Sequence, residues 1–282
     1  MLAWVEATLG VKICGMRALK GGSSSSIHSL RVEGKNCPQT VVLRRYVLEE
    51  LNAEEPDIAE REARVLQLLE RVDVPTPGLL AVDPTGRHAG VPTIVMTRVG
   101  GRLDWAPTDL DGWLHQLAWV LPEIHAASIN ATDGVREFTP YAPESWEPPG
   151  WLTNKLLWER AVEVFHGPRL DPDRVFIHRD YHPGNILWRR GRVTGVVDWQ
   201  AASIGPRAAD VWHCRANLIG RFGIDVADRF LHLWQAHTGD PYHPWAETVM
   251  LVDALGWAAP TTHQQGADLE QLLARRLAEI GG

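Results

Sequence analysis

Cysteine is scarce in this chain, which has only three in 282 residues: Cys14, Cys37 and Cys214. They are widely spaced and odd in number, and they form no C-x-x-C pair. The sequence therefore predicts neither a disulfide framework nor a cysteine metal site. We expect a reducing environment and a cytoplasmic location.

Long apolar runs and an excess of basic charge are also lacking. No uninterrupted apolar run reaches the roughly 18 residues of a membrane-spanning helix. The apolar N-terminal stretch contains Glu6 and Lys12, so it reads as neither a signal peptide nor a span. The net charge of −7 disfavours a nucleic-acid surface, which needs a basic patch. We expect no membrane and no nucleic acid as partners, and the oligomeric state stays open.

The most informative segment runs from His178 to Asn185 and reads H-R-D-Y-H-P-G-N. It follows a short apolar run, 175–177, that is typical of a buried strand. Pro183-Gly184 then forces a turn. Two further short strands are predicted, and the second ends at Asp198. A polar loop held between strands is typical of catalysis that depends on positioning.

Three oxygen-bearing side chains in this segment suggest a chemistry. Asp180 offers a carboxylate that can accept the proton of a hydroxyl. Asn185 and Asp198 offer an amide oxygen and a second carboxylate, which suit magnesium. Phosphoryl transfer from a nucleotide needs these parts in this order. The alternative is a polar turn with incidental acids, but H-x-D-x-x-x-x-N before a strand ending in Asp is much rarer than H-x-D alone.

These residues resemble the aminoglycoside phosphotransferase and choline-kinase group, the small-molecule branch of the protein-kinase-like fold. The resemblance rests on His178, Asp180, the run H-P-G-N-I-L at 182–187 and Val197-Asp198-Trp199. It implies an α+β, bilobal protein-kinase-like fold. A small N-terminal lobe, 1–98, would hold an antiparallel sheet and one main helix, and a larger, mainly helical lobe would span 99–282.

The same resemblance implies roles for the site residues. Asp180 would be the catalytic acid/base, and Asn185 and Asp198 would bind Mg²⁺, with ATP or GTP as the phosphate donor. Asp210 would brace the catalytic loop, although an acid favoured by a helix N-terminus is an equally good local interpretation. We also interpret His178 and Arg179 as loop braces that hydrogen-bond backbone carbonyls.

Two absences narrow the class of kinase. The A-P-E signature of protein kinases is missing, and only about a dozen residues follow Asp198 before Asp210, where a peptide-gripping segment would need more room. The sequence therefore favours a small hydroxylated acceptor. The pattern G-x-x-x-x-G-K-[ST] is also missing, which excludes a Walker-type P-loop.

A glycine- and serine-rich tract lies between two predicted strands in the N-terminal part. Such a loop can cover nucleotide phosphates through backbone N–H groups and hydroxyls. Taken alone, it is more often a hairpin tip. We nevertheless predict nucleotide contacts from four of its residues: Gly22, Ser23, Ser24 and Ser25.

A cation and an acid are predicted to pair behind that loop. Val42 and Arg44 share one face of a predicted strand, 40–47, and Glu62 falls on the apolar stripe of a predicted helix, 57–72. A buried, unpaired carboxylate is costly, so Glu62 needs a partner. The resemblance implies that this partner is Arg44, as in the strand–helix ion pair of kinases. The resemblance puts Arg44 where kinases usually carry lysine, and arginine can also hold phosphates.

The resemblance also supplies a nucleotide hinge, which the local sequence alone does not show. It implies that the backbone of Met96, Thr97 and Val99 binds the purine, with Val42 as a further nucleotide contact. From the local sequence we place the boundary between the lobes near Thr97 to Gly101, where Gly100-Gly101 makes a flexible break.

The sequence thus predicts a magnesium- and nucleotide-dependent kinase of a small molecule. The alternatives are an inactive nucleotide-binding regulator of the same fold and a protein kinase. The acceptor stays open among an aminoglycoside-like antibiotic, a macrolide, a sugar, an amino alcohol and another metabolite. Conceivable acceptor contacts are Trp212, His213, Arg215 and Trp245.

Overall fold

The computed structural model of the chain describes residues 1–19, 25–35, 39–141, 145–168, 174–255 and 259–281. The chain divides into two compact units. The N-terminal unit comprises 1–103 and 186–202, and the C-terminal unit comprises 104–185 and 203–282.

These units do not coincide with the predicted lobes, 1–98 and 99–282, because a hairpin from the second half of the chain packs in the N-terminal unit. Arg102 and Trp188 exchange backbone hydrogen bonds of 3.0 and 2.8 Å, and the Val196 N–H donates to Pro75 at 2.8 Å. The assignment of separate nucleotide and catalytic lobes stays a prediction.

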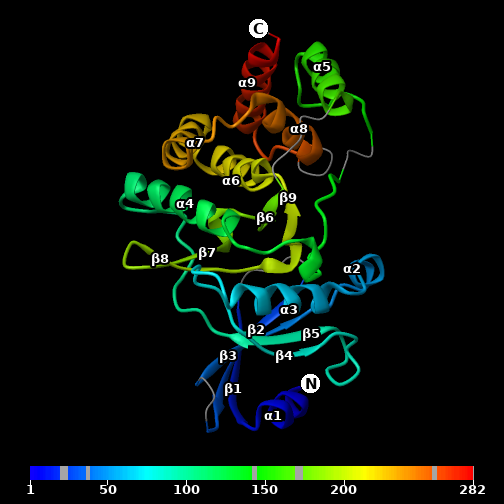
Figure 1. The fold of residues 1–282 in the computed structure, drawn as a ribbon, viewed down its shortest axis with the longest axis vertical. Coiled ribbons are helices and arrows are strands. Elements are labelled where there is room, and N and C mark those ends of the chain that lie inside the picture. Colours follow the sequence, from blue (N-terminus) through cyan, green and yellow to red (C-terminus); the bar gives the residue numbers. More distant parts are fainter. Residues whose placement is uncertain (20–24, 36–38, 142–144, 169–173, 256–258, 282) are drawn as a thin grey trace. The chain divides into compact units, whose positions relative to one another are not determined.

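The N-terminal unit is built on an antiparallel sheet of five strands in the order β1-β2-β3-β5-β4 (Figure 1). Its strands are β1 (Lys12–Ala18), β2 (Ser26–Glu33), β3 (Thr40–Arg45), β4 (Leu79–Asp83) and β5 (Thr93–Thr97). Its helices are α1 (Leu2–Leu9), α2 (Glu49–Glu54) and α3 (Ile58–Leu69).

Strand alternation places different chemistry on the two faces of this sheet. Val41 and Leu43 of β3 pack into an apolar core with Val5 of α1. Because successive side chains point to opposite faces, Arg44 faces the other way, where it meets Glu62 of α3. The helices α1 and α3 therefore cover opposite faces of the sheet.

The hairpin in this unit consists of β7 (Ile186–Arg189) and β8 (Arg192–Val196). Its two turn residues, Arg190 and Gly191, both have positive φ, as a tight turn between twisted antiparallel strands requires. A short 3₁₀ turn, η3 (Trp199–Ala201), follows and packs against α3. The hairpin thus delivers Asp198 to the region of α3.

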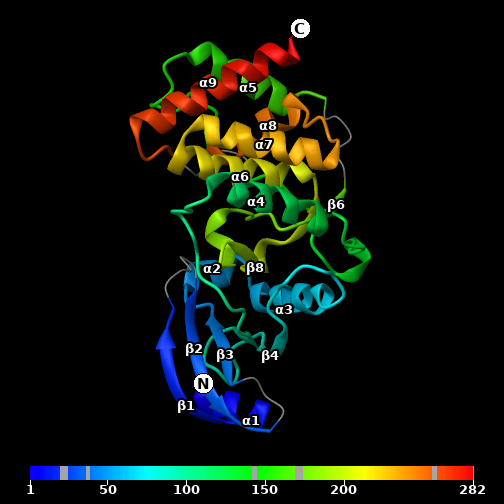
Figure 2. The same cartoon turned by 90° about the vertical axis from the view of Figure 1, so that its left-hand side faces the viewer.

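The C-terminal unit is mainly helical (Figure 2). Its helices are α4 (Leu110–His125), α5 (Lys155–His166), α6 (Arg207–Phe222), α7 (Ile224–Thr238), α8 (Pro244–Leu255) and α9 (His263–Ile280). Short 3₁₀ turns are η1 (Ala131–Asp133) and η2 (Pro183–Asn185), and β6 (Val175–Ile177) pairs with β9 (Ser203–Gly205). The predicted α+β class is confirmed. Within the described residues, no helix has the length and apolar character needed to cross a bilayer.

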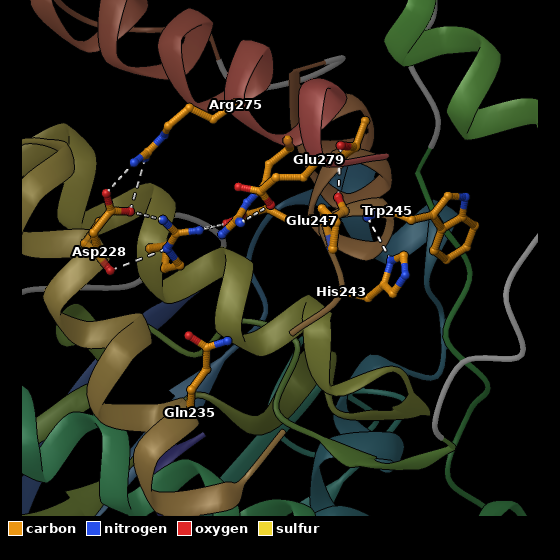
Figure 3. Close-up of polar contacts among 12 residues, drawn as sticks. Asp228, Gln235, His243, Trp245, Glu247, Arg275 and Glu279 are labelled. Carbon is orange, nitrogen blue, oxygen red and sulfur yellow. Dashed lines mark hydrogen bonds and ion pairs between the residues drawn. The ribbon is translucent and has the colours of Figure 1, made fainter. Parts of the chain in front are cut away.

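A buried ionic cluster joins the helices of this unit (Figure 3). Arg215 of α6 is fully buried and pairs with Asp228 of α7 and Glu247 of α8. Arg275 of α9 donates to Asp228 at 2.8 Å, and Arg276 pairs with Glu247. Burial lowers the pKa of Arg215 to about 10, so the guanidinium stays charged at neutral pH. Because a buried ion without its partner is costly, this cluster fixes how these helices pack.

We expect Glu247→Gln to destabilise the protein by about 3 kcal/mol, because it leaves Arg215 buried beside a neutral amide. Glu279→Gln is the matched control, since Glu279 pairs with Arg276 at the surface and exposed pairs contribute about 0–1 kcal/mol. Urea unfolding measures the free energy of unfolding of the parent and of both variants. Equal losses in the two variants would show that the cluster does not stabilise the fold.

Candidate active site

The loop between β6 and η2 carries Asp180 in the C-terminal unit. One carboxylate oxygen, Oδ1, lies 2.8 Å from Nε2 of His213 on α6 and 3.7 Å from Nε2 of His182. The other, Oδ2, accepts a hydrogen bond of 2.9 Å from Nδ2 of Asn185. The side chain is about one third exposed, so Asp180 is both anchored and reachable.

These contacts determine the charge state of Asp180. Burial alone would raise its pKa, but the hydrogen bond and charge of His213, with the charges of His182 and His178, outweigh burial and lower the pKa far below its usual range. Asp180 therefore remains a carboxylate throughout the neutral range.

The backbone around Asp180 is held by Asp210, a fully buried acid in the first turn of α6. Its carboxylate accepts the N–H groups of His178 at 2.9 Å and Arg179 at 2.6 Å, and it lies 3.0 Å from Nε2 of His125. Arg179 has a φ of 67°, which is unfavourable outside glycine and needs such support. Through these contacts Asp210 can hold the backbone of the loop in place.

His178 contributes to the same arrangement. Its ring is fully buried, and its Nδ1 accepts the N–H of Asp180 at 3.2 Å. His178 and Asp210 both contact the loop backbone, and this contact of His178 is with an N–H group where a carbonyl was predicted. Their bracing roles stay predictions.

Asn185 is buried and uses its amide nitrogen twice. Nδ2 donates to the backbone oxygen and to Oδ2 of Asp180, both at 2.9 Å. This orientation leaves the carbonyl oxygen Oδ1 of Asn185 for another partner. An amide oxygen in that position is suited to a hard cation such as Mg²⁺.

In the N-terminal unit, Arg44 lies between two acids. Its Nη1 is 3.0 Å from Glu62 and 2.7 Å from Oδ1 of Asp198, and its Nε donates to Oγ of Ser25 at 3.0 Å. The ion pair expected between Arg44 and Glu62 is present. Tyr46 also donates its hydroxyl to Glu62. The side chain of Arg44 is only 3% exposed, so these partners hold a buried charge.

The two acids beside Arg44 lie in different surroundings. Burial raises the pKa of Glu62, while the guanidinium and the Tyr46 hydroxyl oppose that rise. Asp198 has a φ of 71°, a left-handed conformation that is uncommon for a residue with a side chain. Its side chain is 20% exposed. The carboxylate of Asp198 is thus fixed by Arg44 and still open to a ligand.

The remaining nucleotide-binding predictions fall in the N-terminal unit. Val42 pairs with Met96 across β3 and β5, on the face that carries Arg44. Oγ1 of Thr97 accepts the Gly78 N–H at 2.8 Å, and the Val99 side chain packs against Gly195 so closely that a Cβ there would clash. Gly22, Ser23 and Ser24 lie outside the described residues. None of these contacts tests nucleotide binding.

A cavity of about 730 Å³ lies in the C-terminal unit and includes Asp180 in its wall. Trp212 and His213, two of the conceivable acceptor contacts, line it. Trp245 lines a separate cavity of about 170 Å³ that does not include Asp180. Arg215 is fully buried in its ion pairs, so it is unsuited to an acceptor contact and serves packing instead.

Asp180, His182 and His213 also offer one oxygen and two nitrogens within 4.8 Å of one another. Such a donor set suits zinc better than magnesium. However, Nδ1 of His182 accepts the Gly184 N–H at 3.1 Å, which leaves the proton of a neutral ring on Nε2, facing Asp180. This tautomer favours hydrogen bonding over metal binding at the cluster.

Comparison with known proteins identifies the family. A family model described as "Phosphotransferase enzyme family" matches residues 16–247. The chain belongs to this phosphotransferase family. It is a kinase of small molecules, as predicted.

Two solved structures in this group share the fold over nearly the whole chain. A thermostable mutant of aminoglycoside phosphotransferase APH(4)-Ia, in ternary complex with ADP and hygromycin B, is 16% identical, with 99% of this chain and 98% of that chain covered and a TM-score of 0.66. Macrolide 2'-phosphotransferase MphH from Brachybacterium faecium is 19% identical, with coverages of 98% and 97% and a TM-score of 0.61. The predicted protein-kinase-like fold is confirmed.

A curated relative matches over a short segment. The N-acetylmuramate/N-acetylglucosamine kinase of Neisseria meningitidis serogroup B is 37% identical over 57 residues, which are 20% of this chain and 17% of that protein. The chain therefore spans less than a fifth of this relative's length.

Sequence reasoning missed two partners of the site. Tyr46 lies two residues after Arg44 in the predicted strand 40–47, but its bond to Glu62 was not predicted. His213 lies three residues after Asp210 on α6, and residues at this spacing share a helix face. If Asp210 faces the loop that carries Asp180, His213 is expected to face it too. The spacing of these two residues could therefore have predicted the contact between His213 and Asp180.

We expect His213→Ala to raise the pKa of Asp180 towards the usual value of about 3.9, because His213 makes the main contribution that lowers it. Asp180 would then take up its proton at a higher pH than in the parent. A carbon NMR titration of the Asp180 carboxyl measures the change. His88→Ala, a change of an exposed histidine in the N-terminal unit, is the control, and an Asp180 titration identical in all three proteins would contradict the assigned cause.

Proposed function

We propose that this kinase transfers the terminal phosphate of ATP or GTP to a hydroxyl of a small molecule. The reaction depends on Mg²⁺, and Asp180 is the group that receives the proton of the acceptor hydroxyl. The position of Asp180 is the main support for this proposal. It is an ionised carboxylate on a braced loop, and it forms part of the wall of a cavity large enough for a small molecule.

The lowered pKa of Asp180 refines its role. A strong general base needs a pKa near the working pH, and Asp180 lies far below it. Its carboxylate is better suited to orient the acceptor hydroxyl and to receive the proton as the new oxygen–phosphorus bond forms. Positioning and charge stabilisation contribute most of the catalysis in phosphoryl transfer.

Asn185 and Asp198 are proposed to hold the magnesium ion. The free carbonyl oxygen of Asn185 and the carboxylate of Asp198 are both hard oxygen donors, which fit Mg²⁺. When bound, the ion would neutralise charge on the phosphate oxygens. Arg44 would keep the Asp198 carboxylate in place.

A buried nitrogen of Arg44 supports a phosphate contact. Among the described residues, no hydrogen-bond acceptor meets Nη2 of Arg44. Since a buried N–H without a partner is costly, a ligand that supplies an acceptor there would stabilise the site. A phosphate oxygen fits this requirement, and Ser25 beside it would complete the contact. Gly22, Ser23, Ser24, Met96, Thr97, Val99 and Val42 remain proposed nucleotide contacts, with Glu62 as the partner that positions Arg44.

The relatives support the general class of donor and acceptor. The APH(4)-Ia structure contains ADP, which favours an adenine nucleotide here, with GTP as the alternative. Hygromycin B, macrolides and N-acetylated amino sugars, named for the relatives, share alcohol groups. An alcohol on a sugar-like molecule is therefore the acceptor group that we propose.

We expect Asp180→Asn to lower phosphate transfer by about 10²–10⁴-fold, because the amide cannot receive the hydroxyl proton. The near-isosteric change should leave nucleotide binding intact. A nucleotide-consumption screen across hydroxylated metabolites and antibiotics measures transfer, and calorimetry measures binding. Transfer within tenfold of the parent would exclude the assigned role.

We expect Asp198→Asn to weaken binding of the magnesium–nucleotide complex at least tenfold, because it removes a charged oxygen ligand. Binding of the nucleotide without magnesium should change much less. Asp73→Asn, a change of an exposed acid, is the control for net charge. Calorimetric titrations that show equal affinities for the complex in parent and variant would remove Asp198 from the metal site.

A further inference from the structure

The cavity beside Asp180 is lined along one face of α6. His213, Ala216, Asn217, Gly220 and Arg221 all contribute to its wall. Their spacing of i, i+3, i+4, i+7 and i+8 is that of one helix face. At 1.5 Å per residue, His213 and Arg221 are separated by about 12 Å along the helix. The cavity therefore has an end at Asp180 and His213 and a remote end at Arg221.

The charges of this wall disfavour a polycation. Among the lining residues that the structure describes, Asp180 is the one acid, and it is paired with His213, whereas Arg221 adds a positive charge. Asp253, next to the lining residue Ala254, is buried, and so is Asp268, which accepts a hydrogen bond from Gln264. A molecule with several ammonium groups would find too few carboxylates, and each unpaired charge removed from water is costly.

Neutral polar groups line the middle of the cavity and complement hydroxyls. Nδ2 of Asn217 donates to the His213 backbone oxygen at 3.0 Å, which leaves its carbonyl oxygen as an acceptor. Oε1 of Gln265 accepts the N–H and the hydroxyl of Thr261 at 2.8 and 3.1 Å, which leaves its NH₂ group as a donor. A hydroxyl both donates and accepts, so a polyhydroxylated ligand can satisfy both side chains.

An indole lies at the reacting end. The Trp105 ring is close enough to the catalytic loop that a Cβ on Gly184 would lie 3.3 Å from its Cζ2, and its centroid is 6.4 Å from that of His182. Trp105 is half-buried and also lines the cavity. An indole offers a large apolar face, against which the C–H face of a sugar ring can pack.

We propose that the acceptor is a sugar acid, bound with a ring hydroxyl at Asp180 and its carboxylate at Arg221. Trp105 packs against the ring, and Asn217 and Gln265 bind its other hydroxyls. Uncharged sugars bind in the same way but more weakly, and polycationic aminoglycosides are poor acceptors. The assignment rests on the proposed function, because it takes Asp180 as the residue that receives the acceptor hydroxyl.

The test compares related sugars of different charge. Glucose, galactose and mannose are each assayed with the corresponding uronate and 2-amino sugar, together with a polycationic aminoglycoside, for nucleotide consumption that depends on Asp180. We expect kcat/KM to be at least tenfold higher for a uronate than for its hexose, and lowest for the amino sugars and the aminoglycoside. An equal or reversed order, or use of none of the uronates, overturns the proposal.

The variants Arg221→Gln and Arg221→Lys test the carboxylate contact. Arg221→Gln should lower kcat/KM for the uronate at least tenfold, mainly through KM, and leave the hexose unchanged, while Arg221→Lys should restore part of the loss. Arg229→Gln on α7, outside the cavity lining, is the matched control and should change neither value. Equal losses for uronate and hexose in Arg221→Gln would mean that Arg221 only supports the fold, which overturns the contact.

The failure of this inference differs from the failure of the proposed function. Transfer to an aminoglycoside that depends on Asp180 and not on Arg221 would keep the kinase mechanism and overturn the sugar acid. A protein that binds no magnesium–nucleotide complex and transfers phosphate to no acceptor would overturn both.

Discussion

The buried guanidinium of Arg44 is the interaction on which the arrangement of the N-terminal unit depends. A cation removed from water needs partners, and Glu62, Asp198 and Ser25 supply them. These three come from α3, from the segment after β8 and from the residue just before β2. One charge on β3 thus holds α3, Ser25 and the segment after β8 relative to the sheet, and it orients the carboxylate proposed for magnesium. Loss of this pairing would loosen all of them together.

The same constraint acts through a buried acid in the C-terminal unit. Asp210 is satisfied by the backbone N–H groups of His178 and Arg179, so the unfavourable conformation of Arg179 is held in place. Asp180 follows directly and is presented to the cavity. One turn further along α6, His213 pairs with Asp180, and the rest of that face continues to Arg221. A single helix therefore positions the catalytic loop and lines the proposed acceptor site.

Some of this arrangement follows from the sequence, because local patterns carry it. An acid on an apolar helix stripe must find a cation, and the resemblance to kinases indicated Arg44 as the partner of Glu62. Strand periodicity and glycine positions likewise placed β2, β3 and the hairpin. The sequence does not show in which unit a hairpin packs, so the grouping of 186–202 with the N-terminal unit was missed. Arg215 was considered as an acceptor contact, but the structure buries it against Asp228 and Glu247 from other helices. No local sequence pattern connects these three residues, so the sequence does not show that Arg215 is buried.

Asp180, Asn185 and Asp198 are proposed to act together on one nucleotide and one acceptor hydroxyl. Diffraction from crystals grown with Mn²⁺ and a non-hydrolysable ATP analogue tests it most directly, because the anomalous signal locates the metal. The account predicts a manganese ion bound by Oδ1 of Asn185, the carboxylate of Asp198 and phosphate oxygens, with Asp180 nearby and not coordinated. A metal bound only at Asp180, His182 and His213, or carboxylates of Asp180 and Asp198 too far apart to reach one triphosphate, would contradict it.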